Sequence, residues 1–115
     1  MPSVHTVVET PAFLADAERL FTPQERDALV DMIAENPECG VLVPGAGGIR
    51  KVRFGFGGRG KRGEARVIYL FGGRDIPIFL LAAFAKNEQA DLSGAERSAL
   101  SRQVDAMVSR YRRRK

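Results

Sequence analysis

The sequence predicts an α+β fold: a four-stranded, mainly antiparallel sheet with helices on one face, in the order β-α-α-β-β-β-α. Two helix starts follow one another near the N-terminus, apolar runs occupy the middle, and one long amphipathic stripe precedes the C-terminus. The last two apolar runs are separated by a turn of only four residues. Because parallel strands need a crossover of about a dozen residues, this short turn favours antiparallel pairing.

A β-branched run and two capping signals define the N-terminal elements. Residues 4–9 (VHTVVE) predict a strand that stops at Thr10 and Pro11. Thr10 can cap and Pro11 can open a helix with one apolar face. Residues 22–25 (TPQE) have the Thr-x-x-Glu form of a capping box and predict a second helix, which ends at Asn36-Pro37.

Three further runs, at residues 49–54, 66–71 and 76–84, predict the rest of the sheet. The turn at residues 72–75 favours a hairpin between the second and third of them. Since these last two runs are almost entirely apolar, we expect their strands to be central and covered on at least one face.

A helix and a basic tail are predicted at the C-terminal end. Ser93 to Glu96 forms another capping box, and an apolar stripe follows from Leu100 to Tyr111. We interpret residues 110–115 as a basic tail that is either disordered or in contact with nucleic acid. Residues 1–115 fit one domain of the common size of about 100–150 residues.

Composition limits both compartment and chemistry. No run approaches the ~20 apolar residues of a membrane span, and the N-terminus lacks a secretory signal pattern, so we expect a cytoplasmic protein without a membrane partner. Cys39 is the only cysteine and His5 the only histidine. These counts exclude an internal disulfide, a cysteine or two-histidine metal site and a paired-histidine ribonuclease mechanism. We expect no metal and no cofactor.

Charge is strongly divided along the chain. Residues 1–49 hold two bases against eight acids, whereas residues 50–115 hold sixteen bases against six acids. Seven of the sixteen bases lie between residues 50 and 66. Such a concentrated positive surface attracts polyanions by neutralising phosphates and releasing counterions. The sequence therefore predicts a nucleic acid as partner.

Strand alternation sorts the bases of this region. Lys51 and Arg53 fall on one face of the strand at residues 49–54, and Arg50 falls on the other. Arg66 begins the next strand and can border the same concavity as Lys51 and Arg53. Each cation alone would be an ordinary solvated residue, but their clustering predicts a phosphate-binding site.

The loop between these strands, GFGGRGKR at residues 55–62, nearly matches a P-loop. Arg62 stands where a magnesium-binding Ser or Thr is required, and the loop joins two strands, which excludes nucleotide hydrolysis. A flexible hairpin loop explains the glycines but not the bases. Since glycines let the backbone approach phosphate, we predict that Arg59, Lys61 and Arg62, together with Arg50, contact RNA.

Three linked segments carry a family resemblance: GGIRKVR at residues 47–53, GKRGEARVIY at 60–69 and KNEQADL at 86–92. Together with two helices before a strand meander, they resemble the RelE/ParE superfamily of bacterial toxins, particularly its HigB-type branch. The resemblance implies a small RelE-like fold. It also implies a toxin of a type II toxin–antitoxin system, an mRNA interferase that enters the ribosomal A site and cleaves messenger RNA without a metal.

The resemblance implies roles for four basic residues. Arg66 would hold the scissile phosphate, and Lys51 would activate the ribose 2′-hydroxyl or stabilise its developing charge. Arg53 would support the pentavalent transition state, and Lys86 would assist phosphate binding. In such chemistry the 2′-oxygen attacks its own adjacent phosphate, so positioning and preorganised positive charge supply much of the acceleration.

Two positions depart from the family pattern. Asn87 stands where the founding branch has an arginine, and Leu92 and Ser93 lie near the place of its tyrosine. The general acid is therefore unassigned. Glu88 is the nearest candidate by position, either as an acid or as a structural residue.

The resemblance further implies a cognate antitoxin, expected to be a helix-turn-helix DNA-binding protein, with operator DNA bound only through it. Two alternatives stay open. ParE-type toxins of the same superfamily poison DNA gyrase without cutting RNA, and a non-catalytic RNA- or ribosome-binding module would use the same bases to bind phosphate. Retention of Lys51, Arg53 and Arg66 favours the nuclease.

Overall fold

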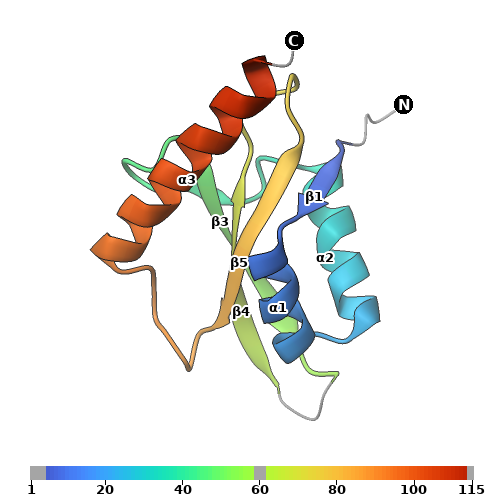
Figure 1. Cartoon of the computed structure of the whole chain (residues 1–115). Helices are drawn as coiled ribbons and strands as arrows, with labels where there is room; N and C mark the ends of the chain where they lie inside the picture. The colour runs from blue at the N-terminus through green and yellow to red at the C-terminus, as the bar shows by residue number, and fades with distance from the viewer. Residues whose placement is uncertain (1–4, 59–61, 114–115) are drawn as a thin grey trace.

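The computed structural model describes residues 5–58 and 62–113, which form one mixed sheet with helices packed on both faces (Figure 1). In these residues the elements are β1 (Val7–Glu9), α1 (Pro11–Leu20), α2 (Pro23–Glu35), β2 (Val41–Leu42), β3 (Ile49–Phe56), β4 (Gly63–Leu70), β5 (Ile78–Ala85) and α3 (Gly94–Arg113). The strand order is β1-β5-β4-β3-β2, which places the meander of β3, β4 and β5 at the centre. The predicted α+β class is confirmed.

The described sheet has five strands rather than the four that we predicted. The additional strand, β2, pairs antiparallel with β3, with Val41 opposite Lys51 and Leu42 opposite Arg50. Both of its residues are exposed, so the strand has no alternating burial pattern that the sequence could reveal. At the other edge β1 pairs with β5 in parallel, and the remaining pairs are antiparallel.

Helices cover both faces of the sheet, and our expectation of one covered face was wrong. Helices α1 and α2 bury Phe13, Leu29 and Ile33 against one face, where Val67 and Tyr69 of β4 lie. Helix α3 buries Val104 on the other face, which holds residues such as Ile49, Ile68 and Leu70. Because β4 is apolar at consecutive positions, both of its faces must be removed from water.

Helix α2 begins at the predicted capping box, and the same carboxylate also anchors the loop after β3. The Glu25 backbone N–H donates to Thr22 Oγ1 (3.1 Å), and the Thr22 N–H donates to Glu25 Oε1 (2.8 Å). Glu25 Oε2 accepts from the N–H groups of Gly57 (2.8 Å) and Gly58 (3.1 Å). These bonds, chiefly the one from Thr22, hold the pKa of Glu25 below its ordinary value of 4.5.

We expect Glu25→Ala to destabilise the protein by about 2 kcal/mol at neutral pH, because the hydrogen bonds from Thr22, Gly57 and Gly58 to the carboxylate are lost. Because the folded pKa of Glu25 is lowered, this contribution is present above pH 4.5 and is lost as pH falls through the folded value. Urea unfolding at neutral and at acid pH measures both effects. Asp31→Ala, which removes an exposed carboxylate from the same helix, is the control; an equal loss in both variants would contradict the prediction.

Helix α3 also begins at its predicted capping box, where Glu96 N–H donates to Ser93 Oγ (3.1 Å) and Ser93 N–H donates to Glu96 Oε1 (2.8 Å). The helix continues to Arg113, through most of the segment that we interpreted as a tail. Near its end, Arg112 Nε donates to Asp75 Oδ2 at 3.0 Å. Among the described helices, none has the length and apolar character needed to cross a membrane.

Candidate functional site

The register of the β3–β4 hairpin brings the predicted phosphate-binding residues together. Arg53 lies directly opposite Arg66, and Lys51 lies opposite Ile68. Because alternate residues share a face, Lys51, Arg53 and Arg66 all lie on the face covered further along by α3.

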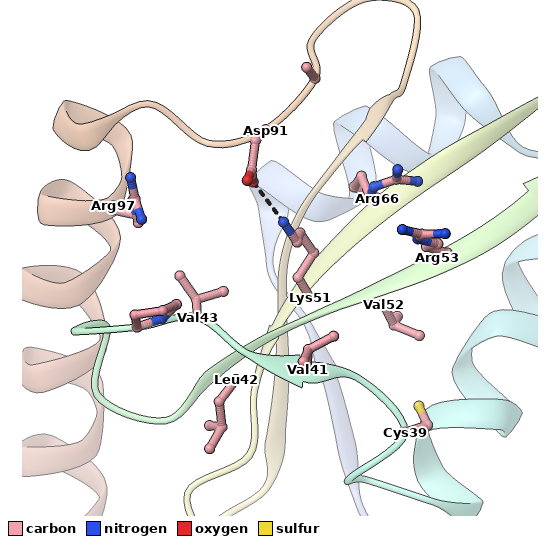
Figure 2. Close-up of a pocket in the computed structure, with 12 residues that line it drawn as sticks. Cys39, Val41, Leu42, Val43, Lys51, Val52, Arg53, Arg66, Asp91 and Arg97 are labelled. Atoms are coloured by element: carbon pink, nitrogen blue, oxygen red, sulfur yellow. Dashed lines mark hydrogen bonds and ion pairs between the residues drawn. The ribbon is translucent and has the colours of Figure 1, made fainter.

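These three residues line a cleft of about 620 Å³. Strands β3 and β4 provide its cationic wall, the β2 region provides an apolar wall, and the connection after β5 and the start of α3 close the opposite side (Figure 2). The apolar wall consists of Val41, Leu42, Val43 and Pro44, and the opposite side carries Asp91 and Arg97. The cleft therefore has a net positive lining and one apolar rim.

Arg66 is the least accessible cation of the cleft, with 9% of its side chain exposed against 75% for Arg53. Its guanidinium donates to the Glu64 carboxylate, and Arg53 Nε lies 4.0 Å from Glu64 Oε1. The hydrogen bond from Arg66, aided by the charges of Arg53 and Lys86, holds the pKa of Glu64 below its usual range. Two arginines thus share one carboxylate, and guanidinium groups arranged in this way are also suitable donors for phosphate oxygens.

Lys51 is held by a second carboxylate. Its Nζ lies 2.9 Å from Asp91 Oδ1, which also accepts from the Leu92 backbone N–H at 2.8 Å. Only 26% of the Lys51 side chain is exposed. In Figure 2 the Lys51 ammonium points across the cleft toward Asp91, and Arg97 of α3 lies beyond that carboxylate. The ion pair holds the Lys51 ammonium within the cleft.

We expect Lys51→Ala to raise the pKa of Asp91 toward its ordinary value of 3.8, because the hydrogen bond from Lys51 is the chief reason that it is lowered. In the wild type the pair stabilises the fold above pH 3.8, and this contribution is lost as pH falls through the lower folded pKa. Exposure of Asp91 keeps it small. NMR titration of the carboxyl carbon measures the pKa, with Lys51→Arg as the charge-retaining control. An unchanged value in Lys51→Ala would contradict the pairing.

Lys86 and Arg50 lie outside the lining of the cleft. Lys86 is exposed at the end of β5, where its backbone N–H donates to Glu64 O (2.8 Å) and its charge acts on the Glu64 carboxylate. Arg50 is directed to the opposite face of β3 and donates to Gly40 O at 2.7 Å. Lys86 therefore lies near Arg53 and Arg66, which contact the same carboxylate. Arg50 instead holds the turn before β2 through its bond to Gly40.

The predicted loop bases are spread more widely. Arg62 lines a separate small cavity with Arg19 and Phe56, and Arg59 and Lys61 lie outside the described residues. Glu88, which we considered as a general acid, accepts from Arg19 Nη1 (2.6 Å) and from the Ala85 N–H (3.1 Å). These contacts tie the end of β5 to α1 and make Glu88 a structural residue in this arrangement.

Asp91 and Arg97 are cleft residues that the sequence did not identify. Both follow the last strand, and the capping box only predicted that Arg97 would lie in the first turns of α3. Their approach to Lys51 depends on how α3 packs over the sheet, and no local pattern encodes it. The one sequence signal for Asp91 was its place in residues 86–92, one of the three segments that carry the family resemblance.

A cleft lined by four cations from three elements and by one carboxylate is suited to a phosphodiester backbone. The part of the chain that builds it corresponds to a known family. Residues 26–113 match the family described as the RelE toxin of the RelE/RelB toxin–antitoxin system. This match spans β2 to β5 and α3, and with them every lining residue of the cleft. The chain therefore belongs to the RelE toxin family.

Proposed function

We propose that this toxin is a ribosome-dependent endoribonuclease that cleaves messenger RNA in the A site of the small ribosomal subunit and thereby inhibits translation. The observation that supports the proposal most is the convergence of Lys51, Arg53 and Arg66 in one cleft. Cleavage without a metal needs positive charge around one phosphate, and this cleft supplies it from two adjacent strands. We also propose that the toxin belongs to the HigB-type branch and that it cleaves RNA without a metal ion.

In the proposed reaction the scissile phosphate replaces the Glu64 carboxylate between Arg66 and Arg53. Planar guanidinium groups suit this task because each can bind two phosphate oxygens. The ribose 2′-oxygen approaches Lys51, which leaves Asp91 and either helps to remove the hydroxyl proton or stabilises the negative charge that forms. Lys86 adds positive charge at the rim.

The bond changes are those of an intramolecular phosphoryl transfer. The 2′-oxygen forms a bond to phosphorus while the bond from phosphorus to the 5′-oxygen breaks. The 2′-hydroxyl gives up its proton to water as it attacks, and the leaving 5′-oxygen takes up a proton from water. The products are a 2′,3′-cyclic phosphate and a 5′-hydroxyl end. Positioning and preorganised charge contribute most of the acceleration, in line with general experience of phosphoryl transfer.

Family membership implies an antitoxin partner. We propose a helix-turn-helix DNA-binding antitoxin in the same cytoplasmic compartment, through which alone operator DNA would be contacted. Val41 and Leu42 at the rim are 71% and 56% exposed, beside the cationic wall. A segment with apolar and acidic side chains would cover both features and block access of RNA to the cleft.

Incubation of the protein with messenger RNA, with and without programmed ribosomes, tests the function. Primer extension maps new 5′ ends, and their labelling by polynucleotide kinase without prior dephosphorylation identifies 5′-hydroxyl groups. We expect cleavage of ribosome-bound message only. Ribosome binding without cleavage would favour a non-catalytic module, and inhibition of gyrase supercoiling in a parallel assay would favour a ParE-type toxin.

A further inference from the structure

A second cavity of about 400 Å³ continues from the cleft along α3. Pro44 and Arg97 line both spaces, so the two are neighbours on one surface. The remaining lining residues of the second cavity are Gly45, Gly94, Ser98, Ser101 and Arg102. Within the described part of the chain its lining therefore carries two arginines and two hydroxyls, and no carboxylate.

The helical repeat explains why these side chains share one surface. Residues 97 and 101, and residues 98 and 102, are four positions apart, and residues 98 and 101 are three apart, so each pair lies on successive turns of the same side of the helix. They face the loop at Pro44 and Gly45, where Gly45 has a φ of 70° that disfavours side chains with a Cβ. Because Gly45 has no side chain, a ligand can approach the backbone of the loop at this point.

The chemistry of this lining is that of a phosphate site. Arginine offers a planar fork of donors to phosphate oxygens, and serine hydroxyls are common donors to the same groups. The next carboxylate along this side of α3 is Asp105, one turn beyond Ser101, where its Oδ1 lies 3.9 Å from the position that a Cβ on Gly47 would take. Asp105 therefore marks the end of the cationic surface.

We propose that Arg97, Ser98, Ser101 and Arg102 form a second phosphate subsite, which binds the backbone of the same RNA strand next to the nucleotides in the cleft. This inference rests on the proposed function, because it takes the cleft as the place of the scissile phosphate. Arg97 joins the two sites, and Arg102 distinguishes them, since it lines only the second cavity. The ligand is a single-stranded RNA backbone, and recognition does not depend on base identity.

Binding of 2′-O-methyl oligonucleotides tests the subsite without cleavage, because they lack the attacking hydroxyl. A short oligonucleotide occupies only the cleft. Longer oligonucleotides carry additional nucleotides on the 5′ or the 3′ side. We expect Arg102→Ala to weaken binding of one extended oligonucleotide several-fold and to leave the short one unchanged. The slope of log affinity against log salt should fall by about 0.7, the value for one phosphate contact on a single strand. Ser98→Ala with Ser101→Ala should lower affinity in the same direction.

Arg74→Ala is the matched control, because it removes the same charge from the exposed turn after β4, near the C-terminal end of α3. Equal effects of Arg102→Ala and Arg74→Ala would overturn the subsite. The subsite would also be overturned if Arg102→Ala bound every oligonucleotide as the wild type does but sedimented less with ribosomes. That result would assign Arg102 to a contact with ribosomal RNA. Wild-type cleavage with no effect of Arg102→Ala on any oligonucleotide rejects the subsite and retains the nuclease. An oligonucleotide effect without wild-type cleavage retains the subsite and rejects the nuclease.

Discussion

We expect the Arg66→Ala variant to cleave ribosome-bound message about 10²–10³-fold more slowly than the wild type, the range found when one donor to a developing anion is removed. Arg66 is the most enclosed cation of the cleft, and its neighbour Arg53 is largely exposed. A charge that is shielded from water acts more strongly on a bound phosphate than an exposed one. We therefore expect Arg66→Ala to slow cleavage more than Arg53→Ala does.

Single-turnover cleavage on programmed ribosomes measures this effect, and sedimentation with ribosomes measures binding separately. Arg66→Lys retains the charge but not the forked donors, and we expect an intermediate rate. Arg74→Ala, which removes an exposed arginine from the turn after β4, should retain the wild-type rate. A thermal unfolding curve for each variant separates lost chemistry from lost structure. A folded Arg66→Ala protein that cleaves within a few-fold of the wild type would rule out phosphate binding by Arg66 as a catalytic requirement.

Among substitutions that remove a single heavy atom, we expect the largest effect on stability from Tyr69→Phe. We predict that it lowers the free energy of unfolding by about 3 kcal/mol. The ring is fully buried in β4. Its hydroxyl donates to Pro37 O (2.7 Å) and accepts from the Gly40 backbone N–H (2.9 Å). Phenylalanine preserves the ring packing but leaves both backbone groups without this partner, and an unsatisfied buried group costs about 1–3 kcal/mol.

This bond also connects the core to the candidate site. The turn at residues 37–40 leads into β2, which forms the apolar rim of the cleft. A Cβ on Gly40 would lie 2.9 Å from Lys51 O and from the Tyr69 hydroxyl, so the turn packs tightly against both strands. We therefore expect Tyr69→Phe to displace the rim as well as to destabilise the fold.

Urea unfolding at neutral pH measures the loss, and Tyr111→Phe is the control. Tyr111 is 38% exposed, so removal of its hydroxyl should change stability by less than about 0.5 kcal/mol. Burial raises the pKa of Tyr69 above its ordinary value of 10.0. The wild type should therefore lose stability as pH rises above 10.0, since the unfolded state ionises first, and Tyr69→Phe should lack this part of the loss. Equal stabilities of Tyr69→Phe and the wild type would refute the prediction.

Local signals in the sequence were sufficient for the helices and most of the sheet. Both capping boxes form between residues three positions apart, at Thr22 and at Ser93, so the sequence contains every group involved. Alternation along β3 correctly separates Lys51 and Arg53 from Arg50, because side chains of a strand point to opposite faces in turn. The short strand β2 was missed, since two exposed residues carry no pattern.

Other features depend on contacts between distant segments. The sequence offered no means to choose the hairpin register that sets Arg53 opposite Arg66. It did not indicate that Glu64 and Asp91 hold the cations of the cleft, or that Glu88 binds Arg19 on α1. In each of these pairs the carboxylate is at least 38% exposed. Ion pairs open to water contribute little free energy, so they follow from the fold rather than direct it.

By itself the sequence determined the α+β class, the helix starts, the uneven charge and the clustered cations Lys51, Arg53 and Arg66, because capping, hydrophobic periodicity and composition act over a few residues. Only the tertiary structure decided which cations meet. Packing of α3 on the second face brings Arg97 and Asp91 to Lys51, and the β2 region closes the cleft beside them. The physical reason is that burial of both apolar faces of β4 sets where the helices lie, and this burial is a property of the whole chain.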